Sequence, residues 1–120
     1  MTQVLVAEDV AAIGISLEDA LTDDGYSVAG PFPSCTTAVA WLESSTPDLA
    51  LLDWRLNDGP CIELARLLRS RGVPILVISG ELEGAGLPAD LRGLPWLEKP
   101  LSERDLLAAL RSLGCSLPSL

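Results

Sequence analysis

Acidic residues follow two short apolar segments of this chain. Residues 4–7, VLVA, run directly into Glu8 and Asp9, and residues 49–52, LALL, run into Asp53. Apolar runs of this length are typical of buried strands. Carboxylates at such strand ends can hold a hard metal ion or act as a nucleophile. Alone, Glu8-Asp9 is better explained as a strand-to-helix turn with an N-capping acid, and Asp53 is explained equally well by a turn. The interpretation therefore depends on which other residues join them.

Two further apolar segments also end on polar groups. Residues 75–79, ILVIS, end on Ser79 before Gly80, and residues 96–98, WLE, lead into Lys99 and Pro100. Alone, the first pair indicates a turn and the second a solvated lysine before a helix. In an open parallel sheet, however, ligands bind beyond the carboxyl ends of the strands. All these groups would then lie at one edge of one sheet.

Strand-length and helix-length segments alternate along the chain. We expect strands at residues 4–7, 26–29, 49–52, 75–79 and 96–98, and helices at about 11–24, 34–45, 60–71, 88–92 and 102–113. We expect Gly30-Pro31 to stop the second strand, and Ile15, Leu17 and Leu21 to form the buried stripe of the first helix. Strands that are apolar along their whole length indicate a parallel sheet covered on both faces.

These elements predict a flavodoxin-like α/β fold, a doubly wound (βα)5 domain with a five-stranded parallel sheet in the order 2-1-3-4-5. We expect one domain over residues 1–120, with a core at about 2–113, a short tail at 114–120 and no output domain. In this order the strands that end on Glu8-Asp9 and on Asp53 are neighbours.

Three crowded carboxylates repel one another unless a cation lies between them. Mg²⁺ takes few protein ligands, all of them oxygens, and shares oxygens with phosphate. The set therefore favours a site in which Asp53 accepts a phosphoryl group. Lys99 and the metal would neutralise its oxygens, Ser79 would bind one of them, and Gly80 would leave room for the group.

Glu8-Asp9, Asp53, Ser79 and Lys99-Pro100, in this order, resemble the receiver domain of bacterial two-component response regulators, over essentially the whole chain. The resemblance implies that Glu8, Asp9, Asp53 and the backbone carbonyl of Arg55 bind Mg²⁺. It implies that Asp53 takes phosphate from a histidine kinase or a histidine phosphotransfer protein. It also implies that Ser79 and Trp96 are switch residues and that Lys99 binds phosphate. The Lys99-Pro100 peptide bond is often cis in this family.

The chain departs from the usual receiver pattern in two places. After Asp53 it reads Trp-Arg-Leu-Asn-Asp-Gly, where many receivers carry Met-Pro, and the Gly- and Pro-rich segment after Ser79 predicts a stunted fourth helix in the region of the output face. We interpret Asp58-Gly59 as a turn. Trp54 is interpreted as packing beside the site or shielding it. Arg55 and Glu81 could pair across the site and slow hydrolysis, or be solvent-facing loop charges.

Other functions fit the sequence less well. A degenerate receiver that binds partners without phosphorylation usually lacks some of the acids. A phosphatase of the haloacid dehalogenase type needs an acid two residues after the nucleophile, where this chain has Arg55. No glycine-rich phosphate-binding motif follows the first strand, which disfavours a nucleotide-binding protein. We expect a switch that catalyses only its own phosphorylation and slow dephosphorylation, and not a conventional enzyme.

The charge of −9 and the isoelectric point of about 4.2 argue against direct nucleic-acid binding. We expect no membrane span and no secretory signal. Three separated cysteines, Cys35, Cys61 and Cys115, without CxxC or histidine, are interpreted as reduced packing residues of a cytoplasmic protein. Output would be carried by contacts with a downstream protein, as a shuttle, a phosphate sink or a homodimer.

Overall fold

Five parallel strands form the central sheet. The computed structural model describes residues 2–56, 58–79, 89–91, 93–98 and 102–115. The strands of the sheet are β1 (Gln3–Ala7), β2 (Ser27–Phe32), β3 (Leu49–Asp53), β6 (Ile75–Ser79) and β7 (Trp96–Glu98). Their spatial order, β2-β1-β3-β6-β7, is the predicted order 2-1-3-4-5, because the short strands β4 and β5 belong to a separate hairpin.

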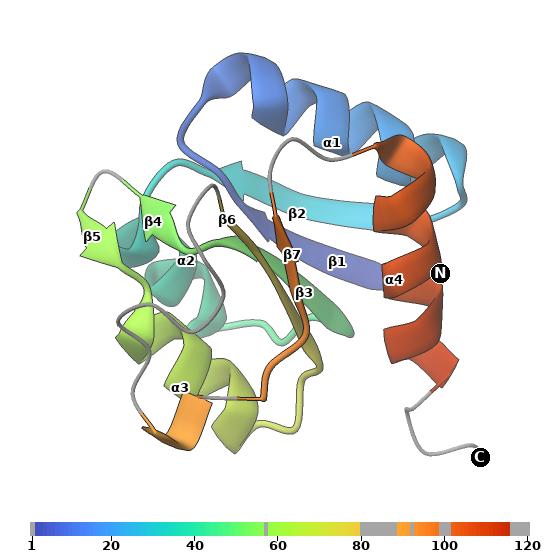
Figure 1. Ribbon diagram of the computed structural model, residues 1–120. Coiled ribbons are helices and arrows are strands. Elements are labelled where there is room, and N and C mark those ends of the chain that lie inside the picture. The colour runs from blue at the N-terminus through green and yellow to red at the C-terminus, as the bar shows by residue number, and fades with distance from the viewer. Residues whose placement is uncertain (1, 57, 80–88, 92, 99–101, 116–120) are drawn as a thin grey trace.

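Helices cover both faces of this sheet (Figure 1). Within these described residues the helices are α1 (Ala11–Asp23), α2 (Cys35–Leu42), α3 (Ile62–Ser70) and α4 (Glu103–Cys115). A 3-10 turn, η1 (Ala89–Leu91), lies where the short fourth helix was expected. Helices α1 and α4 pack on one face, and α2 and α3 on the other. The doubly wound α/β architecture predicted from the sequence is therefore confirmed.

The sheet separates two apolar clusters. Strands β3 and β6 are buried at every position, as expected for strands covered on both faces. Alternate residues of each strand point to opposite faces, so Leu52 joins the cluster beneath α2 and α3, while Leu51 joins the cluster beneath α1 and α4. At about 25 cal/mol per Å² of apolar surface, burial on both faces is the main force that holds β3 in the centre.

Capping residues begin two helices where the sequence predicted. The Ser34 hydroxyl accepts a hydrogen bond from Thr37 N, 3.1 Å away, at the start of α2. The Ser102 hydroxyl accepts one from Asp105 N, 3.0 Å away, at the start of α4. Each bond satisfies an N–H group that the helix itself leaves without a partner.

The prediction that Gly30-Pro31 stops the second strand is wrong. Strand β2 continues to Phe32 across a cis Gly30-Pro31 bond. Gly30 has a φ of +105°, and a Cβ there would lie 2.7 Å from the Val6 carbonyl oxygen. Only glycine tolerates this backbone and this close approach. The extension has a consequence for the site, because the Phe32 carbonyl accepts a 2.9 Å hydrogen bond from Glu8 N.

The buried stripe of α1 was predicted wrongly at one residue. Leu17 and Leu21 are buried as expected, but Ile15 is 58% exposed. Gly14 takes the inward position instead, since a Cβ there would lie 3.1 Å from Pro31. The helix packs closely over β2 at this point, and Ile15 is turned toward solvent.

A hairpin lies between β3 and α3, where the sequence predicted the start of a helix at about residue 60. Strands β4 (Arg55–Leu56) and β5 (Gly59–Pro60) pair antiparallel, and α3 begins only at Ile62. Gly59 has a φ of +104°, which suits a tight turn. The turn predicted at Asp58-Gly59 is confirmed.

Cys35 and Cys61 form a disulfide, which contradicts the prediction of three reduced packing thiols. The two residues are 26 positions apart in sequence, and their Cα atoms lie 5.6 Å apart. Cys35 is the first residue of α2 and Cys61 directly precedes α3. Two right-handed crossovers place both helices on the same face with their first residues at the same edge of the sheet, which brings the sulfurs together.

Arg71 connects the same two helices at their opposite ends. Its guanidinium donates to the carbonyl oxygens of Leu42 and Ser45 at 2.6 and 3.0 Å. Leu42 is the last residue of α2 and Ser45 lies three residues beyond it. The carbonyls at the end of a helix lack intrahelical partners, and Arg71 supplies a donor there. The α2–α3 pair is thus fastened by a covalent bond at one edge of the sheet and by an arginine at the other.

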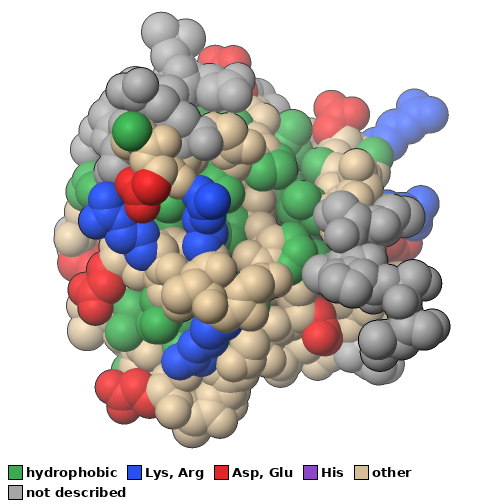
Figure 2. Space-filling model, turned by 90° about the horizontal axis from the view of Figure 1, so that it is seen from below, with side chains coloured by type: hydrophobic (Ala, Val, Ile, Leu, Met, Phe, Trp, Pro, Cys, Tyr) green, Lys and Arg blue, Asp and Glu red, His purple; other side chains and the backbone are tan. Residues whose placement is uncertain are grey.

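The surface seen from below in Figure 2 carries basic and acidic side chains among hydrophobic ones. A pocket of about 340 Å³ lies beside Pro74 and Pro95, which precede β6 and β7. It therefore lies at the amino ends of the strands, away from the edge where the acidic residues gather. Among the described residues, none of the helices has the length and apolar character that crossing a bilayer requires.

The disulfide should contribute measurably to stability. Closing a loop of 26 residues restricts the unfolded chain and stabilises the fold by about 3 kcal/mol. We expect dithiothreitol to lower the urea midpoint of the wild type accordingly, and Cys35→Ser to unfold like the reduced protein with or without reductant. Cys115→Ser, which leaves the bond intact, is the control. Equal midpoints for oxidised and reduced wild type would contradict the assignment.

Candidate functional site

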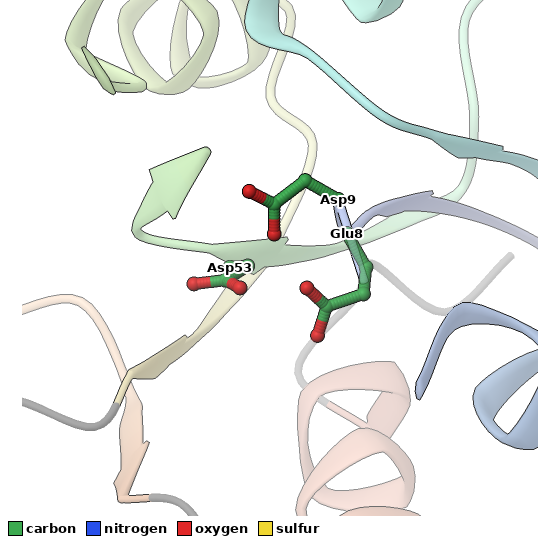
Figure 3. A group of neighbouring side chains, drawn as sticks. All are labelled: Glu8, Asp9 and Asp53. Carbon is green, nitrogen blue, oxygen red and sulfur yellow. The ribbon is translucent and has the colours of Figure 1, made fainter. Parts of the chain in front are cut away.

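Three carboxylates converge at the carboxyl edge of the sheet. One oxygen of each of Glu8, Asp9 and Asp53 lies within 4.8 Å of the others. Figure 3 shows Asp53 at the end of β3 and the other two side chains reaching toward it from the segment after β1. The sequence prediction that these acids meet is therefore confirmed.

Strand register positions these acids. Ala7 on β1 is the partner of Leu52 on β3, so the residues that follow each of them emerge side by side. Glu8 is fixed further by the bond from its N–H to the Phe32 carbonyl. Its carboxylate also accepts a 3.4 Å hydrogen bond from Val10 N at the start of α1. Three neighbouring strands thus define where the acidic group lies.

The donor set fits a hard divalent cation. Glu8 and Asp53 are 2% and 6% exposed, and Asp9 is half-buried. Buried carboxylates so close together repel one another strongly, because the surroundings screen charge less than water does. Oxygen ligands in this number suit Mg²⁺, which keeps part of its water shell and so needs few protein ligands. The half-buried Asp9 leaves one side of the group open to solvent.

Ser79 lies at the end of β6, beside the acidic group. Ile78 is the register partner of Asp53, and Ile78 O accepts a 2.9 Å hydrogen bond from Trp54 N, so Ser79 is one residue beyond this pair. It is 2% exposed. The described structure thus places Ser79 at the edge predicted for it. Gly80, Glu81, Lys99, Pro100 and the side chain of Arg55 lie outside the described residues, so their predicted roles stay predictions.

Two tryptophans connect the site to β7. Trp54 follows Asp53 and is fully buried, and its ring centroid lies 6.1 Å from that of Trp96, with the ring planes tilted by 51°. Trp96 is half-buried, and within the described structure its indole N–H is buried without a hydrogen-bond partner. A tilted pair at this distance is a favourable aromatic contact. Of the two alternatives predicted for Trp54, packing in the core next to Asp53 is therefore the one observed.

Asp58 fastens the hairpin to α2. Its carboxylate accepts hydrogen bonds from Cys35 N at 2.9 Å, Thr36 N at 3.0 Å and the Thr36 hydroxyl at 2.8 Å. Bonds to the charged form, first from Cys35 N and then from Thr36, hold the pKa of Asp58 below its usual value. Asp58 is thus a structural acid and no part of the acidic group, in agreement with the prediction of a turn.

Sequence reasoning missed two features around the site, the disulfide and the role of Asp58. Both join segments that are more than twenty residues apart. A signal for the first was present, since Cys35 and Cys61 each precede or open an expected helix on the same side of the sheet. For Asp58 the local sequence indicated a turn, and nothing in it specified α2 as the partner.

Comparison with protein families identifies one match across most of the chain. Residues 4–111 match the family model described as "Response regulator receiver domain". The KDP operon transcriptional regulatory protein KdpE of Escherichia coli K12 is 40% identical over 116 residues, which cover 92% of this chain and 50% of that protein. The chain spans about half the length of the curated relatives it matches.

Solved structures agree with this match. The crystal structure of a response regulator receiver protein from Sinorhizobium medicae has a TM-score of 0.82 and 28% identity, covering 96% of this chain and 95% of that one. The solution structure of the receiver domain of PhyR from Erythrobacter litoralis has a TM-score of 0.84 and 25% identity, covering 99% and 95%.

Replacing Asp58 by alanine should destabilise the fold in a pH-dependent way. Its pKa is depressed in the folded state, so its bonds stabilise the fold above the unfolded-state pKa of about 3.9 and are lost as the pH falls through the lower folded value. For this exposed group we expect a loss of about 1 kcal/mol at pH 7, the scale of helix-capping bonds. Urea unfolding at pH 7 and below pH 4 measures the difference.

The control for this prediction is Asp23→Ala, which removes an exposed carboxylate from the end of α1. A gap between wild type and Asp58→Ala that stays constant down to acid pH would show that the charged carboxylate is not what holds the hairpin.

Proposed function

Because the chain belongs to the response regulator receiver family, we propose that it is a phosphoacceptor of a two-component phosphorelay. Asp53 takes a phosphoryl group, with the help of Mg²⁺, from the phosphohistidine of a histidine kinase or a histidine phosphotransfer protein. The observation that carries the proposal is the convergence of Glu8, Asp9 and Asp53 within 4.8 Å at the carboxyl edge of the sheet.

In the proposed transfer, a carboxylate oxygen of Asp53 attacks the phosphorus atom of the donor. A phosphorus–oxygen bond to Asp53 forms, the phosphorus–nitrogen bond breaks, and the imidazole nitrogen keeps the electron pair and takes up a proton. Strand β3 is buried along its length and holds the attacking group rigidly, which lowers the entropic cost of alignment. Ser79 and Lys99 would receive the phosphoryl oxygens, with the Gly80 N–H assisting.

Glu8, Asp9, Asp53 and the backbone carbonyl of Arg55 would hold the metal. Mg²⁺ bound there supplies positive charge that offsets the acids and the phosphoryl oxygens. The three acids offer oxygen atoms around one position, which is the donor type that Mg²⁺ prefers. An intact set of this kind supports a metal-binding role, and it disfavours the alternative of a degenerate receiver, which usually lacks some of the acids.

The response to phosphorylation would run through Ser79 and Trp96. A phosphoryl group on Asp53 gives the Ser79 hydroxyl a new acceptor, and the movement of Ser79 changes the space around Trp96 on the neighbouring strand. The pairing of β6 with β7 and the contact with Trp54 support this route. The protein would act as a switch and catalyse only its own phosphorylation and slow dephosphorylation.

The donor would dock on the start of α1. Val10, Ile13 and Ile15 are 47%, 37% and 58% exposed, and they are the large apolar side chains that the described surface leaves most accessible. They follow directly after the acidic pair Glu8-Asp9. Exposed apolar side chains beside a reactive group are typical of an interface, so this surface supports contact with a donor protein.

We place the protein in the cytoplasm, where histidine kinases present their phosphohistidines. The downstream target would be another protein. The contact with it would be made by the described domain, or by additional sequence such as that present in the relatives, of which this chain matches about half. The proposal agrees with a protein that acts as a phosphoryl shuttle, as a phosphate sink or as a homodimer.

Asp53→Asn should abolish phosphorylation. We expect acetyl phosphate with Mg²⁺ to add one phosphoryl group to the wild type, measured by intact-protein mass, and none to the variant, because an amide is not nucleophilic. Asp48→Asn is the matched control. Asp48 lies just before β3, at its opposite end, where its carboxylate accepts a 2.8 Å bond from Gln3 N. Phosphorylation of Asp53→Asn would show that another residue is the acceptor, and no phosphorylation of the wild type would favour the degenerate receiver.

The double variant Ile13→Ala, Ile15→Ala should slow transfer from a phosphorylated histidine kinase by about tenfold, the loss expected when apolar interface contacts worth about 1.4 kcal/mol are removed. Phosphorylation by acetyl phosphate, which needs no docking surface, should keep the wild-type rate. An equal loss with both donors would indicate damage to the site and would contradict the docking assignment.

A further inference from the structure

We propose that the Cys35–Cys61 disulfide is a reversible, thiol-controlled clamp on the hairpin that adjoins Asp53, so that its reduction weakens Mg²⁺ binding at the acidic group. The inference deepens the proposed function and rests on it. Three observations support it: where the bond lies, what it holds and which of its ends is accessible.

The bond lies at the functional edge of the sheet. Cys35 opens α2 after β2, and Cys61 precedes α3 after β3. Both helices begin beyond the carboxyl ends of their strands, at the edge where Asp53 ends β3. A covalent tie placed only for stability could equally well join the far ends of the helices, where Arg71 joins them.

The bond holds the segment that leaves the site. Cys61 N donates a 3.3 Å hydrogen bond to the carbonyl of Trp54, the residue after Asp53. The Cys35 sulfur lies 3.6 Å from the Gly59 carbonyl oxygen. The first contact closes the base of the hairpin and the second holds β5 against Cys35, and the Arg55 carbonyl, proposed as a metal ligand, lies on β4 of the same hairpin.

The bond is reachable from one side. Cys61 is 1% exposed, whereas Cys35 is half-buried. An incoming thiolate would therefore attack Cys35, the more exposed of the two residues, while Cys61 belongs to the apolar cluster that also contains Leu56 and Leu64. Disulfides of cytoplasmic proteins are usually transient and redox-sensing, and this asymmetry suits exchange through one defined sulfur.

The reduction is a two-electron exchange with a dithiol. A thiolate of the reductant attacks the Cys35 sulfur, the bond between the cysteines breaks, and Cys61 leaves as a thiolate and takes up a proton. The second thiol of the reductant then attacks the mixed disulfide, releases Cys35 as a thiol and leaves the reductant as a disulfide. Oxidation by an oxidised dithiol is the reverse.

Without the disulfide, the binding of Mg²⁺ must itself order the hairpin. In the oxidised protein the hairpin is held before the cation arrives. In the reduced protein, Asp58 remains the main fastening to α2, and part of the binding free energy is used to fix the backbone that carries the Arg55 carbonyl. Affinity for Mg²⁺ should therefore fall on reduction, and the response of Asp53 should fall with it.

The first test is reversibility in the native protein. We expect dithiothreitol to reduce the pair without denaturant, and oxidised dithiothreitol to restore it, followed by alkylation of free thiols and mass measurement. A bond that opens only in denaturant would make it a structural tie and would overturn the proposal, as would a protein with three free thiols after oxidation.

The second test compares metal binding in the two states. We expect reduction to raise the Mg²⁺ concentration at half-saturation by about 5-fold or more, the low end of couplings between sites, as measured by isothermal titration calorimetry. Backbone amides of the hairpin, at Arg55, Leu56 and Gly59, should exchange hydrogen faster in the reduced protein. Cys35→Ser should match the reduced wild type and ignore dithiothreitol. Cys115→Ser should behave as wild type.

Arg71→Ala provides the matched structural control. It removes the α2–α3 tie at the opposite edge, so it should lower stability while leaving Mg²⁺ affinity and its response to dithiothreitol unchanged. If it weakens Mg²⁺ binding as much as Cys35→Ser does, general loosening of the helix pair explains the effect and the clamp proposal is wrong. Equal affinity, or tighter binding after reduction, also overturns it.

Failure of the proposed function would look different. In that case neither redox state would gain a phosphoryl group from acetyl phosphate, whatever the Mg²⁺ affinities and exchange rates are. Failure of the clamp alone would leave phosphorylation of Asp53 intact and equal in the two redox states.

Discussion

Parallel pairing of β3 between β1 and β6 is the constraint on which the site depends. Because the three strands point the same way and are buried on both faces, their carboxyl ends reach one edge together. The pairing of Ala7 with Leu52 places Glu8 and Asp9 beside Asp53. The same apolar sheet that stabilises the domain therefore also aligns the three acids.

The strands that carry the site could be predicted because their signals are local. An unbroken apolar run such as LALL predicts a buried strand, and the first charged residue after it, Asp53, marks the end of β3 at the edge of the sheet. Ser34 and Ser102 marked two helix starts in the same way, each through a hydroxyl that accepts a bond from its own helix. The acidic group then followed from the strand order alone.

The features that escaped prediction depend on contacts between distant segments. Gly30-Pro31 is a strong local stop signal, yet β2 continues because the Phe32 carbonyl has a partner in Glu8 N. Ile15 fitted a helical stripe, but Gly14 took the inward place because Pro31 leaves no room for a side chain. Cys35 and Cys61 looked like isolated thiols because spacing in the sequence does not show that two helices begin side by side.

The sheet also divides the interior into two apolar clusters that share no residue. One contains the ends of the disulfide-linked helices and both tryptophans of the pair, and the other lies under α1, whose outer side carries Ile15. Side chains on opposite faces do not touch, so changes on the two faces should have nearly additive effects on stability. Selection can therefore adjust the surface over α1 and the hairpin side separately, while β3 between them must stay as it is.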